Sequence, residues 1–240
     1  NTVVCVTAQH REMLDQVLTL FNIQPDYDMN LMKAEQDLFS ITSDVLAGMK
    51  TILEKEQPEL VLVHGDTTTT FAAALAAFYM RIPVGHVEAG LRTRNKYSPF
   101  PEEINRRIAG ILADIHFAPT KFAADNLRHE GVSQTTIFVT GNTVIDALVQ
   151  AAEKPCSFDG LGLDTVNWQK EIILLTCHRR ENWGGPMKQI FSAINDILIR
   201  HPQTELIFPL HKNPTIREIA YSKLGNNKQV HFCEPLDYLP

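Results

Sequence analysis

Several features that define whole classes of protein are missing from this sequence of 240 residues. No apolar run approaches the ~20 residues that a membrane-spanning helix needs, and no signal peptide is evident. There is no basic block, and the formal net charge is −6, so nucleic acid is not expected as a partner. The four cysteines show neither a CxxC pair nor a metal-ligand spacing, which predicts reduced thiols in a cytoplasmic protein.

Motifs of several enzyme classes are missing as well. No GxGxxG loop follows a predicted strand, so the sequence does not indicate a dinucleotide cofactor. It has no GxSxG elbow and no HExxH helix. A histidine and a carboxylate stand two residues apart in "HGD" and again in "HVE", which keeps a metal-dependent phosphoesterase open as the last alternative.

What the sequence does contain is a regular alternation of short apolar strands and amphipathic helices. The helix predicted at 38–55, for example, has its apolar residues at the spacing of one helical face. This order predicts an α/β fold of mostly parallel sheets with helices on both faces, in two Rossmann-like domains. The predicted strands are 3–7, 60–64, 83–88, 115–118 and 137–139, then 172–176, 206–210 and 229–233.

Residues 153–169 interrupt the alternation, because they contain proline and glycine and lack any periodicity. They are interpreted as a linker between an N-terminal domain at 1–160 and a C-terminal domain at 161–240. The chain starts without a methionine, and its second domain has only about three strands. We therefore expect the natural protein to continue beyond both ends.

Two carboxylates follow neighbouring predicted strands. Asp66 comes after strand 60–64, and Glu88 ends strand 83–88. Ligands of open parallel sheets bind at the carboxyl ends of the strands, so both side chains are candidates for one site. Two close carboxylates resist simultaneous ionisation, which is how a site obtains an acid and a base near pH 7. The alternatives are a helix N-cap for Asp66 and a surface position for Glu88.

The segment "YSPFPEEINRR" adds two further candidates, Glu102 and Glu103. Prolines hold this segment still, which would help to place a carboxylate accurately. The alternative is an ordinary helix start with pairs at i, i+4 spacing, Glu102 with Arg106 and Glu103 with Arg107.

Basic residues follow two predicted strands of the second domain. His178 and Arg179 lie in "CHRREN", and His211 lies in "PLHKNP". Arginines at such a place suit a diphosphate. The alternatives are a solvated surface cluster and a histidine that is hydrogen-bonded within its loop.

Six motifs in one order carry a resemblance: "VTAQHREMLDQVL", "VLVHGDTTTT", "PVGHVEAGLRT", "YSPFPEEINR", "FVTGNTVIDAL" and "HRREN". Together they resemble the non-hydrolysing bacterial UDP-N-acetylglucosamine 2-epimerases over nearly the whole chain. The resemblance implies a GT-B-like pair of Rossmann-like domains, truncated here at both ends, in a homodimer that needs neither metal nor nicotinamide. It implies interconversion of UDP-GlcNAc and UDP-ManNAc by anti-elimination of UDP to 2-acetamidoglucal and re-addition, for surface polysaccharide precursors.

The same resemblance implies roles for individual residues. The catalytic candidates are Asp66, Glu88, Glu102 and His178, and Arg179 joins Asp66, Glu88 and His178 in binding the substrate. Many bacterial members are also activated by UDP-GlcNAc at a second site, whose residues match Gln9, His10, Gln36, Arg179 and His211. Where this chain has Glu35 before Gln36, family members often have arginine.

The "GTRPE" and "SGG…EEAP" segments of the family are not in the 240 residues. We therefore expect the isolated chain to be inactive or nearly so. The alternative functions are a GT-B-type glycosyltransferase using a UDP-sugar, a hydrolysing epimerase, and a nucleotide-binding fragment without activity.

Overall fold

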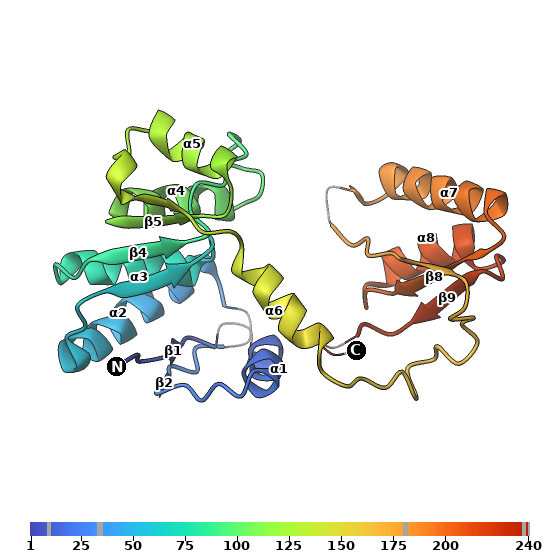
Figure 1. Ribbon diagram of the computed structural model, residues 1–240, viewed down its shortest axis with the longest axis horizontal. Coiled ribbons are helices and arrows are strands. Elements are labelled where there is room, and N and C mark those ends of the chain that lie inside the picture. The colour runs from blue at the N-terminus through green and yellow to red at the C-terminus, as the bar shows by residue number, and fades with distance from the viewer. Residues whose placement is uncertain (9–10, 33–35, 180–181, 237–238, 240) are drawn as a thin grey trace. The chain divides into compact units, whose positions relative to one another are not determined.

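The computed structural model describes residues 1–8, 11–32, 36–179, 182–236 and 239 (Figure 1). The chain forms two compact units, Asn1–Ala152 and Glu153–Pro240, and each is described by itself. The domain limits 1–160 and 161–240 remain a prediction. Within each unit strands and helices alternate, and every described strand pair is parallel, which confirms the predicted α/β fold.

The first unit contains a four-stranded sheet with the order β3-β4-β5-β6, and a separate parallel pair, β1-β2. The strand β2 is not among the strands predicted from the sequence. The elements of this unit are β1 (Cys5–Val6), α1 (Arg11–Leu20), β2 (Tyr27–Asp28), α2 (Leu38–Glu56), β3 (Val61–His64), α3 (Thr68–Tyr79), β4 (Val84–Val87), α4 (Glu102–Leu112), β5 (Ile115–Ala118), α5 (Lys121–His129), β6 (Ile137–Val139) and α6 (Thr143–Ala152).

The core of the first unit lies between α2, α3 and one face of the sheet. The helix α2 buries Ile41, Val45, Met49 and Leu53, which recur at helical spacing. The helix α3 contributes mainly alanines, so its backbone packs close to α2 and to Val63 and Val84 on the strands. Each large side chain buried here stabilises the fold by roughly 1.5–3 kcal/mol.

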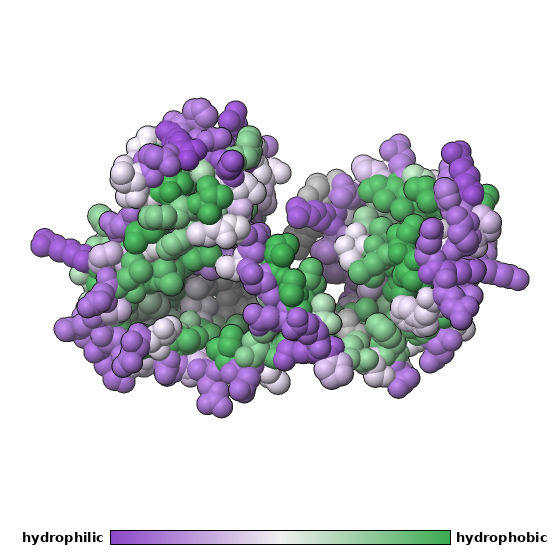
Figure 2. Space-filling view, in the orientation of Figure 1, coloured by the Kyte–Doolittle hydropathy of each residue, from purple (hydrophilic) through white to green (hydrophobic). Residues whose placement is uncertain are grey.

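The opposite face of this sheet is apolar and more exposed. Leu62 on β3 is 61% exposed, and Phe138 on β6 is 49% exposed. Figure 2 shows hydrophobic residues gathered over the strands of this unit. Gly85 leaves room between Leu62 and Phe117, because a Cβ atom at Gly85 would stand 2.6 Å from Cδ2 of Leu62.

The second unit is a three-stranded sheet in the order β7-β8-β9, covered on one face by two helices. Phe191 of α7 packs edge-to-face on Phe208 of β8, with ring centroids 5.4 Å apart. The elements are β7 (Glu171–Leu174), α7 (Gly185–Arg200), β8 (Thr204–Pro209), α8 (Pro214–Leu224) and β9 (Val230–Cys233).

The second half of the predicted linker is part of this second unit. Leu163 and Val166 are buried against Ile207 and Cys233. The amide N–H of Asn167 also donates to a carboxylate oxygen of Glu205 at 2.9 Å. The linker interpretation of residues 153–169 is therefore wrong for this half, because tertiary packing orders a segment that has no periodicity of its own.

The loop after β4 is held close to α5 at Gly90. The side-chain amide of Asn126 donates to the carbonyl oxygen of Gly90 at 3.0 Å. A Cβ atom at Gly90 would stand 2.2 Å from the carbonyl oxygen of Ala123, and the backbone has a φ of +87°. Glycine is therefore required twice over, for its backbone angle and for its lack of a side chain.

We expect Gly90→Ala to lower the free energy of unfolding well beyond the cost of its φ angle. Gly131 is a matched control, because its φ is +89° and nothing stands within 4 Å of its Cβ position. Gly131→Ala should cost about 1–2 kcal/mol, and Gly90→Ala about 1–3 kcal/mol more because of overpacking. Urea unfolding of both variants measures the difference, and equal losses would contradict the close approach.

Candidate active site at the carboxyl edge of the first sheet

Asp66 and Glu88 are brought to the same edge of the sheet. The adjacent strands β3 and β4 end in register, with His64 beside Val87, and the two carboxylates follow within two residues. An oxygen of Glu88 lies 3.3 Å from the position of a Cβ atom on Gly65, the residue before Asp66. The polar edge predicted from the sequence is thus formed.

The helix α3 is capped by Thr67 and not by Asp66. The Thr67 hydroxyl accepts from the Thr70 amide at 3.3 Å, and the Thr70 hydroxyl donates to the carbonyl of His64 at 2.6 Å. The threonines therefore satisfy backbone groups where β3 turns into α3. The alternative reading of Asp66 as the N-cap is wrong, and its carboxylate is available for another partner.

That partner is Arg106 of α4, whose guanidinium makes an ion pair with the Asp66 carboxylate. The side-chain amide of Asn105 donates to the Asp66 carbonyl at 3.0 Å, so two consecutive residues of α4 attach the helix to this turn. The pair predicted between Glu102 and Arg106 is not what the structure shows, because Arg106 reaches Asp66 and also Glu103, at 3.6 Å. Sequence reasoning missed Asn105 and Arg106 as site residues.

Glu102 lies on the same face of α4 as these two residues. Asn105 and Arg106 follow it at i+3 and i+4, the spacing of neighbours on one helix face. The Glu102 side chain is half-buried at the N-terminal end of the helix. This spacing is the signal in the sequence that relates Glu102 to the residues that bind Asp66.

Glu88 is held more loosely than Asp66. Its backbone adopts the left-handed region with a φ of +65°, which directs the chain out of β4. One carboxylate oxygen accepts from the side-chain amide of Asn142 at 3.4 Å, and the other lies 4.0 Å from Nε2 of His64. No arginine pairs with it among the described residues, and its side chain is 26% exposed. A carboxylate with few fixed partners is suited to proton transfer.

A buried histidine supports the turn that carries Asp66. His86 lies on β4 beside Val63, and its Nε2 contacts the Gly65 carbonyl at 2.8 Å. Because a carbonyl only accepts, Nε2 carries the proton and donates it. Burial lowers the pKa of His86 to about 4, and its Nδ1 has no partner in the described residues. His86 is therefore a neutral donor at pH 7.

Glu103 holds the loop between β4 and α4. Its buried carboxylate accepts from the amide of Thr93 at 3.1 Å and from the amide of Arg94 at 3.2 Å. These two bonds satisfy a loop that has little regular structure. Of the two adjacent glutamates, Glu103 thus shapes the loop, while Glu102 makes no ion pair with any residue that the structure describes.

The second unit carries its own polar edge. His178 follows β7 and His211 follows β8, and their rings stack with centroids 5.6 Å apart and planes 9° from parallel. The amide of Asn213 donates to Nδ1 of His211 at 3.1 Å, which leaves Nε2 to carry a proton. Arg179 is exposed beside His178. The strand-end cluster predicted for this unit is therefore formed.

The remaining residues predicted for the activator site are Gln9, His10 and Gln36. Gln9 and His10 lie outside the described residues. Gln36 is half-buried just before α2, whose N-cap is Asp37. Their part in a second nucleotide-sugar site stays a prediction.

Three further observations bear on the expectations from composition. No helix in the described part of the chain is long and apolar enough to cross a membrane. No group of three or more His, Cys, Asp or Glu residues in that part could hold a metal ion. All four cysteines are described, and all are free thiols.

The fold and the two polar edges define a class of protein: a parallel α/β protein with acid–base groups on one sheet edge and cationic groups on another. The sequence model of the UDP-N-acetylglucosamine 2-epimerase family matches residues 1–240. The chain belongs to this family.

Relatives agree with the family match. The UDP-N-acetylglucosamine 2-epimerase of Bacillus subtilis is 52% identical over 239 residues, all of this chain and 62% of the relative. That of Escherichia coli K12 is 51% identical over 243 residues, 99% of this chain and 65% of the relative. The crystal structure of the Neisseria meningitidis enzyme bound to UDP-GlcNAc matches with a TM-score of 0.87 and 48% identity, over 100% of this chain and 66% of that one. The chain thus spans less than two-thirds of the curated relatives' length.

We expect the stability of the protein to depend on pH through His86. Between pH 6.5 and about pH 4, the unfolded chain binds a proton at His86 that the folded chain does not bind. The contribution of His86 to the free energy of unfolding is therefore complete above pH 6.5 and is lost as the pH falls toward 4. The full loss is about 3 kcal/mol. His86→Gln keeps a donor for Gly65 and removes the titration, so its unfolding free energy should fall less between pH 7 and pH 4.5.

The exposed His129→Gln serves as the control and should follow the wild type. Parallel pH curves for wild type and His86→Gln would contradict the assignment. Should His86→Gln fail to fold, an NMR titration of the His86 ring in the wild type measures the pKa directly.

We expect Glu103→Gln to loosen the loop after β4, because a carboxamide presents an N–H group to one of the two amides that the carboxylate accepts from. Leaving a buried donor unsatisfied costs about 1–3 kcal/mol. Hydrogen exchange at the Thr93 and Arg94 amides should therefore be about tenfold faster or more. Glu102→Gln, which loses the same charge one residue away, should leave both amides protected; equal exchange in the two variants would contradict the role of Glu103.

Proposed function

We propose that the protein to which this chain belongs interconverts UDP-GlcNAc and UDP-ManNAc. The observation that carries the proposal is the placement of Asp66 and Glu88 side by side at a sheet edge, with Glu102 on the facing side of α4. Family membership supports it, as does the UDP-GlcNAc bound to the Neisseria meningitidis enzyme. The activity, substrate and partners of the whole protein are part of this proposal.

The proposed reaction is an elimination followed by an addition. In the first step the bond from C1 to the diphosphate oxygen breaks, and UDP leaves with the electron pair. The C2 proton moves to a base, and its bonding electrons form the C1=C2 double bond of 2-acetamidoglucal. In the second step a proton reaches C2 from the other face, and the UDP oxygen bonds to C1 again.

The carboxylates suit this chemistry in different ways. The C2–H bond is barely acidic, so positive charge develops at C1 as UDP leaves, and a nearby carboxylate anion stabilises that charge. Asp66 is fixed by Arg106 and is suited to such a stationary charge. Glu88 and Glu102 have no arginine partner among the described residues, which suits them to accept and return protons.

The edge of the second unit is proposed to bind the diphosphate. His178 and Arg179 present cationic or hydrogen-bonding groups, and the stacked ring of His211 lies beside them. Activation by a second UDP-GlcNAc at Gln9, His10, Gln36, Arg179 and His211 belongs to the same proposal. So do the homodimer and the cytoplasmic location that the sequence predicted.

The test follows the C2 proton of UDP-GlcNAc by NMR in D₂O. Two proteins are compared: the 240-residue chain, and a chimera that adds the flanking segments of the Bacillus subtilis relative. Deuterium at C2 together with new UDP-ManNAc, from either protein, is the expected result. Lack of exchange by both would contradict the proposal and favour a glycosyltransferase, to be tested with acceptor sugars.

In the active protein, we expect Asp66→Asn, Glu88→Gln and Glu102→Gln each to lower kcat by about 10²–10⁴-fold, the usual contribution of a positioned acid or base. The exposed Glu59→Gln has the same charge loss and should retain the wild-type rate. The products of a single turnover distinguish the residue that removes the C2 proton from the residue that returns one. A variant that lacks only the residue returning the proton should release 2-acetamidoglucal and UDP. Wild-type kcat in all three variants would contradict the assignment.

A further inference from the structure

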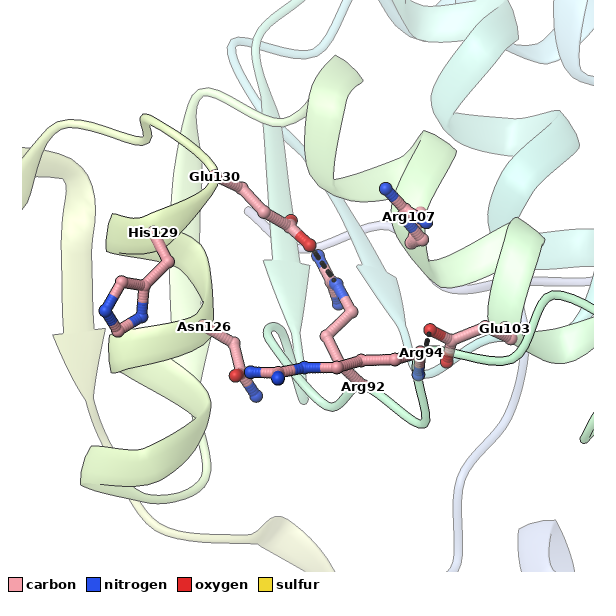
Figure 3. Close-up of a pocket in the computed structure, with 7 residues that line it drawn as sticks. All are labelled: Arg92, Arg94, Glu103, Arg107, Asn126, His129 and Glu130. Atoms are coloured by element: carbon pink, nitrogen blue, oxygen red, sulfur yellow. Dashed lines mark hydrogen bonds and ion pairs between the residues drawn. The ribbon is translucent and has the colours of Figure 1, made fainter.

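A second polar pocket lies in the first unit, between α4 and α5 (Figure 3). It has a volume of about 210 Å³ and is lined by three arginines, a histidine, an asparagine and two glutamates. Neither Asp66 nor Glu88 lines it. The pocket is therefore distinct from the carboxyl edge described above.

Both glutamates of this pocket are already neutralised by partners within the unit. Glu130 receives two hydrogen bonds of 2.8 Å from Nε and a terminal nitrogen of Arg92, which hold the pKa of Glu130 below its usual range. The third nitrogen of Arg92 donates to the carbonyl of Leu91 at 2.7 Å, so each nitrogen of this nearly buried arginine has an acceptor within the unit. Glu103 is occupied by the loop amides and by Arg106, as described above.

Two arginines of the pocket, Arg94 and Arg107, make no ion pair within 4.0 Å among the described residues, although the charge of Arg107 also helps to lower the pKa of Glu130. The Arg94 side chain points toward the α5 side of the pocket, while Arg107 stands on α4 (Figure 3). Glu103 accepts the backbone N–H of Arg94 at 3.2 Å, so the point from which this side chain projects is fixed. His129, at the end of α5, lines the side opposite α4.

The charge and the size of the pocket define its ligand. Three arginines against two glutamates leave a positive pocket on a chain whose net charge is −6. Its volume is below the ~300–1,000 Å³ of pockets for drug-sized ligands, so the occupant is small. One guanidinium group can donate two parallel hydrogen bonds to two oxygens of a phosphate. Two guanidinium groups without an ion pair therefore favour an anion with more than one negative charge.

We propose that this pocket binds phosphate or diphosphate, with Arg94 and Arg107 as its ligands. The ion pair of Arg92 with Glu130 also lines the pocket. Glu103 fixes the backbone of Arg94. This proposal is independent of the epimerase proposal, because neither Asp66 nor Glu88 lines the pocket. Either proposal can therefore fail while the other stands.

The experiment is calorimetric titration of the chain with inorganic phosphate and, separately, with diphosphate at low ionic strength. The wild type should bind at this site, and Arg94→Gln and Arg107→Gln should each weaken binding about tenfold or more, because each change removes a charge-assisted hydrogen bond to the anion. Arg94→Lys keeps the charge without the paired geometry and should lie between. Lys50→Gln, on α2 outside the pocket, loses the same charge and should bind within about twofold of the wild type.

Backbone NMR shifts during the same titration locate the anion, because His178, Arg179 and His211 offer another basic edge. The expected shifts are at Thr93, Arg94 and the end of α5, and they should disappear in Arg94→Gln. Thermal unfolding shows that each variant is folded before it is titrated. Absence of binding by the wild type, wild-type affinity in both Arg→Gln variants, or shifts only around His178 and His211 would overturn the proposal.

Discussion

The ion pair between Arg106 and Asp66 is the contact on which the arrangement of this site depends. It joins the turn after β3 to α4, two segments 40 residues apart in the chain. Arg106 is almost fully buried, with a side-chain exposure of 11%. A buried charge that lost its partner would be strongly destabilising, so the pair constrains α4 as firmly as it constrains the carboxylate.

Support for this pair comes from both sides. Under the turn, the neutral ring of His86 donates to Gly65, and Thr70 donates to the carbonyl of His64. On the helix side, Asn105 donates to the backbone of Asp66, and Glu103 lies 3.6 Å from Arg106. The backbone that carries Asp66 is thus held by neutral donors, and its carboxylate is held by one arginine. Its position is set before any ligand arrives, which is what preorganised electrostatic stabilisation requires.

Much of this could be predicted from the sequence, and the reasons differ between fold and site. The strands at 115–118 and 137–139 match their predicted bounds, because short apolar runs bounded by turn residues are local signals. The strand β2 and the packing of residues 161–167 were missed, because both depend on a partner far along the chain. Local patterns carry no information about such partners.

The same distinction applies to the site. The strand-end positions of Asp66, Glu88, His178 and His211 could be predicted because each follows a recognisable strand, and parallel strands present their carboxyl ends at one edge. The partners Arg106, Asn142 and His86 were missed, because their contacts join residues 21 to 54 positions apart in the chain. The sequence also suggested Arg106 as a partner for Glu102. A short-range pair at i, i+4 contributes little on an exposed helix, and the buried alternative with Asp66 prevails.

The helix α4 contains two pairs of adjacent charged residues, Glu102-Glu103 and Arg106-Arg107. They show how one helix can face two separate sites. Successive residues of a helix point about 100° apart, so adjacent side chains face different surroundings. Arg106 contacts Asp66 at the carboxyl edge, while Arg107 lines the pocket beside α5. Glu103 connects both sides, since one carboxylate contacts Arg106 and also fixes the backbone of Arg94. Any movement of α4 that reshapes one site must therefore strain the contacts of the other.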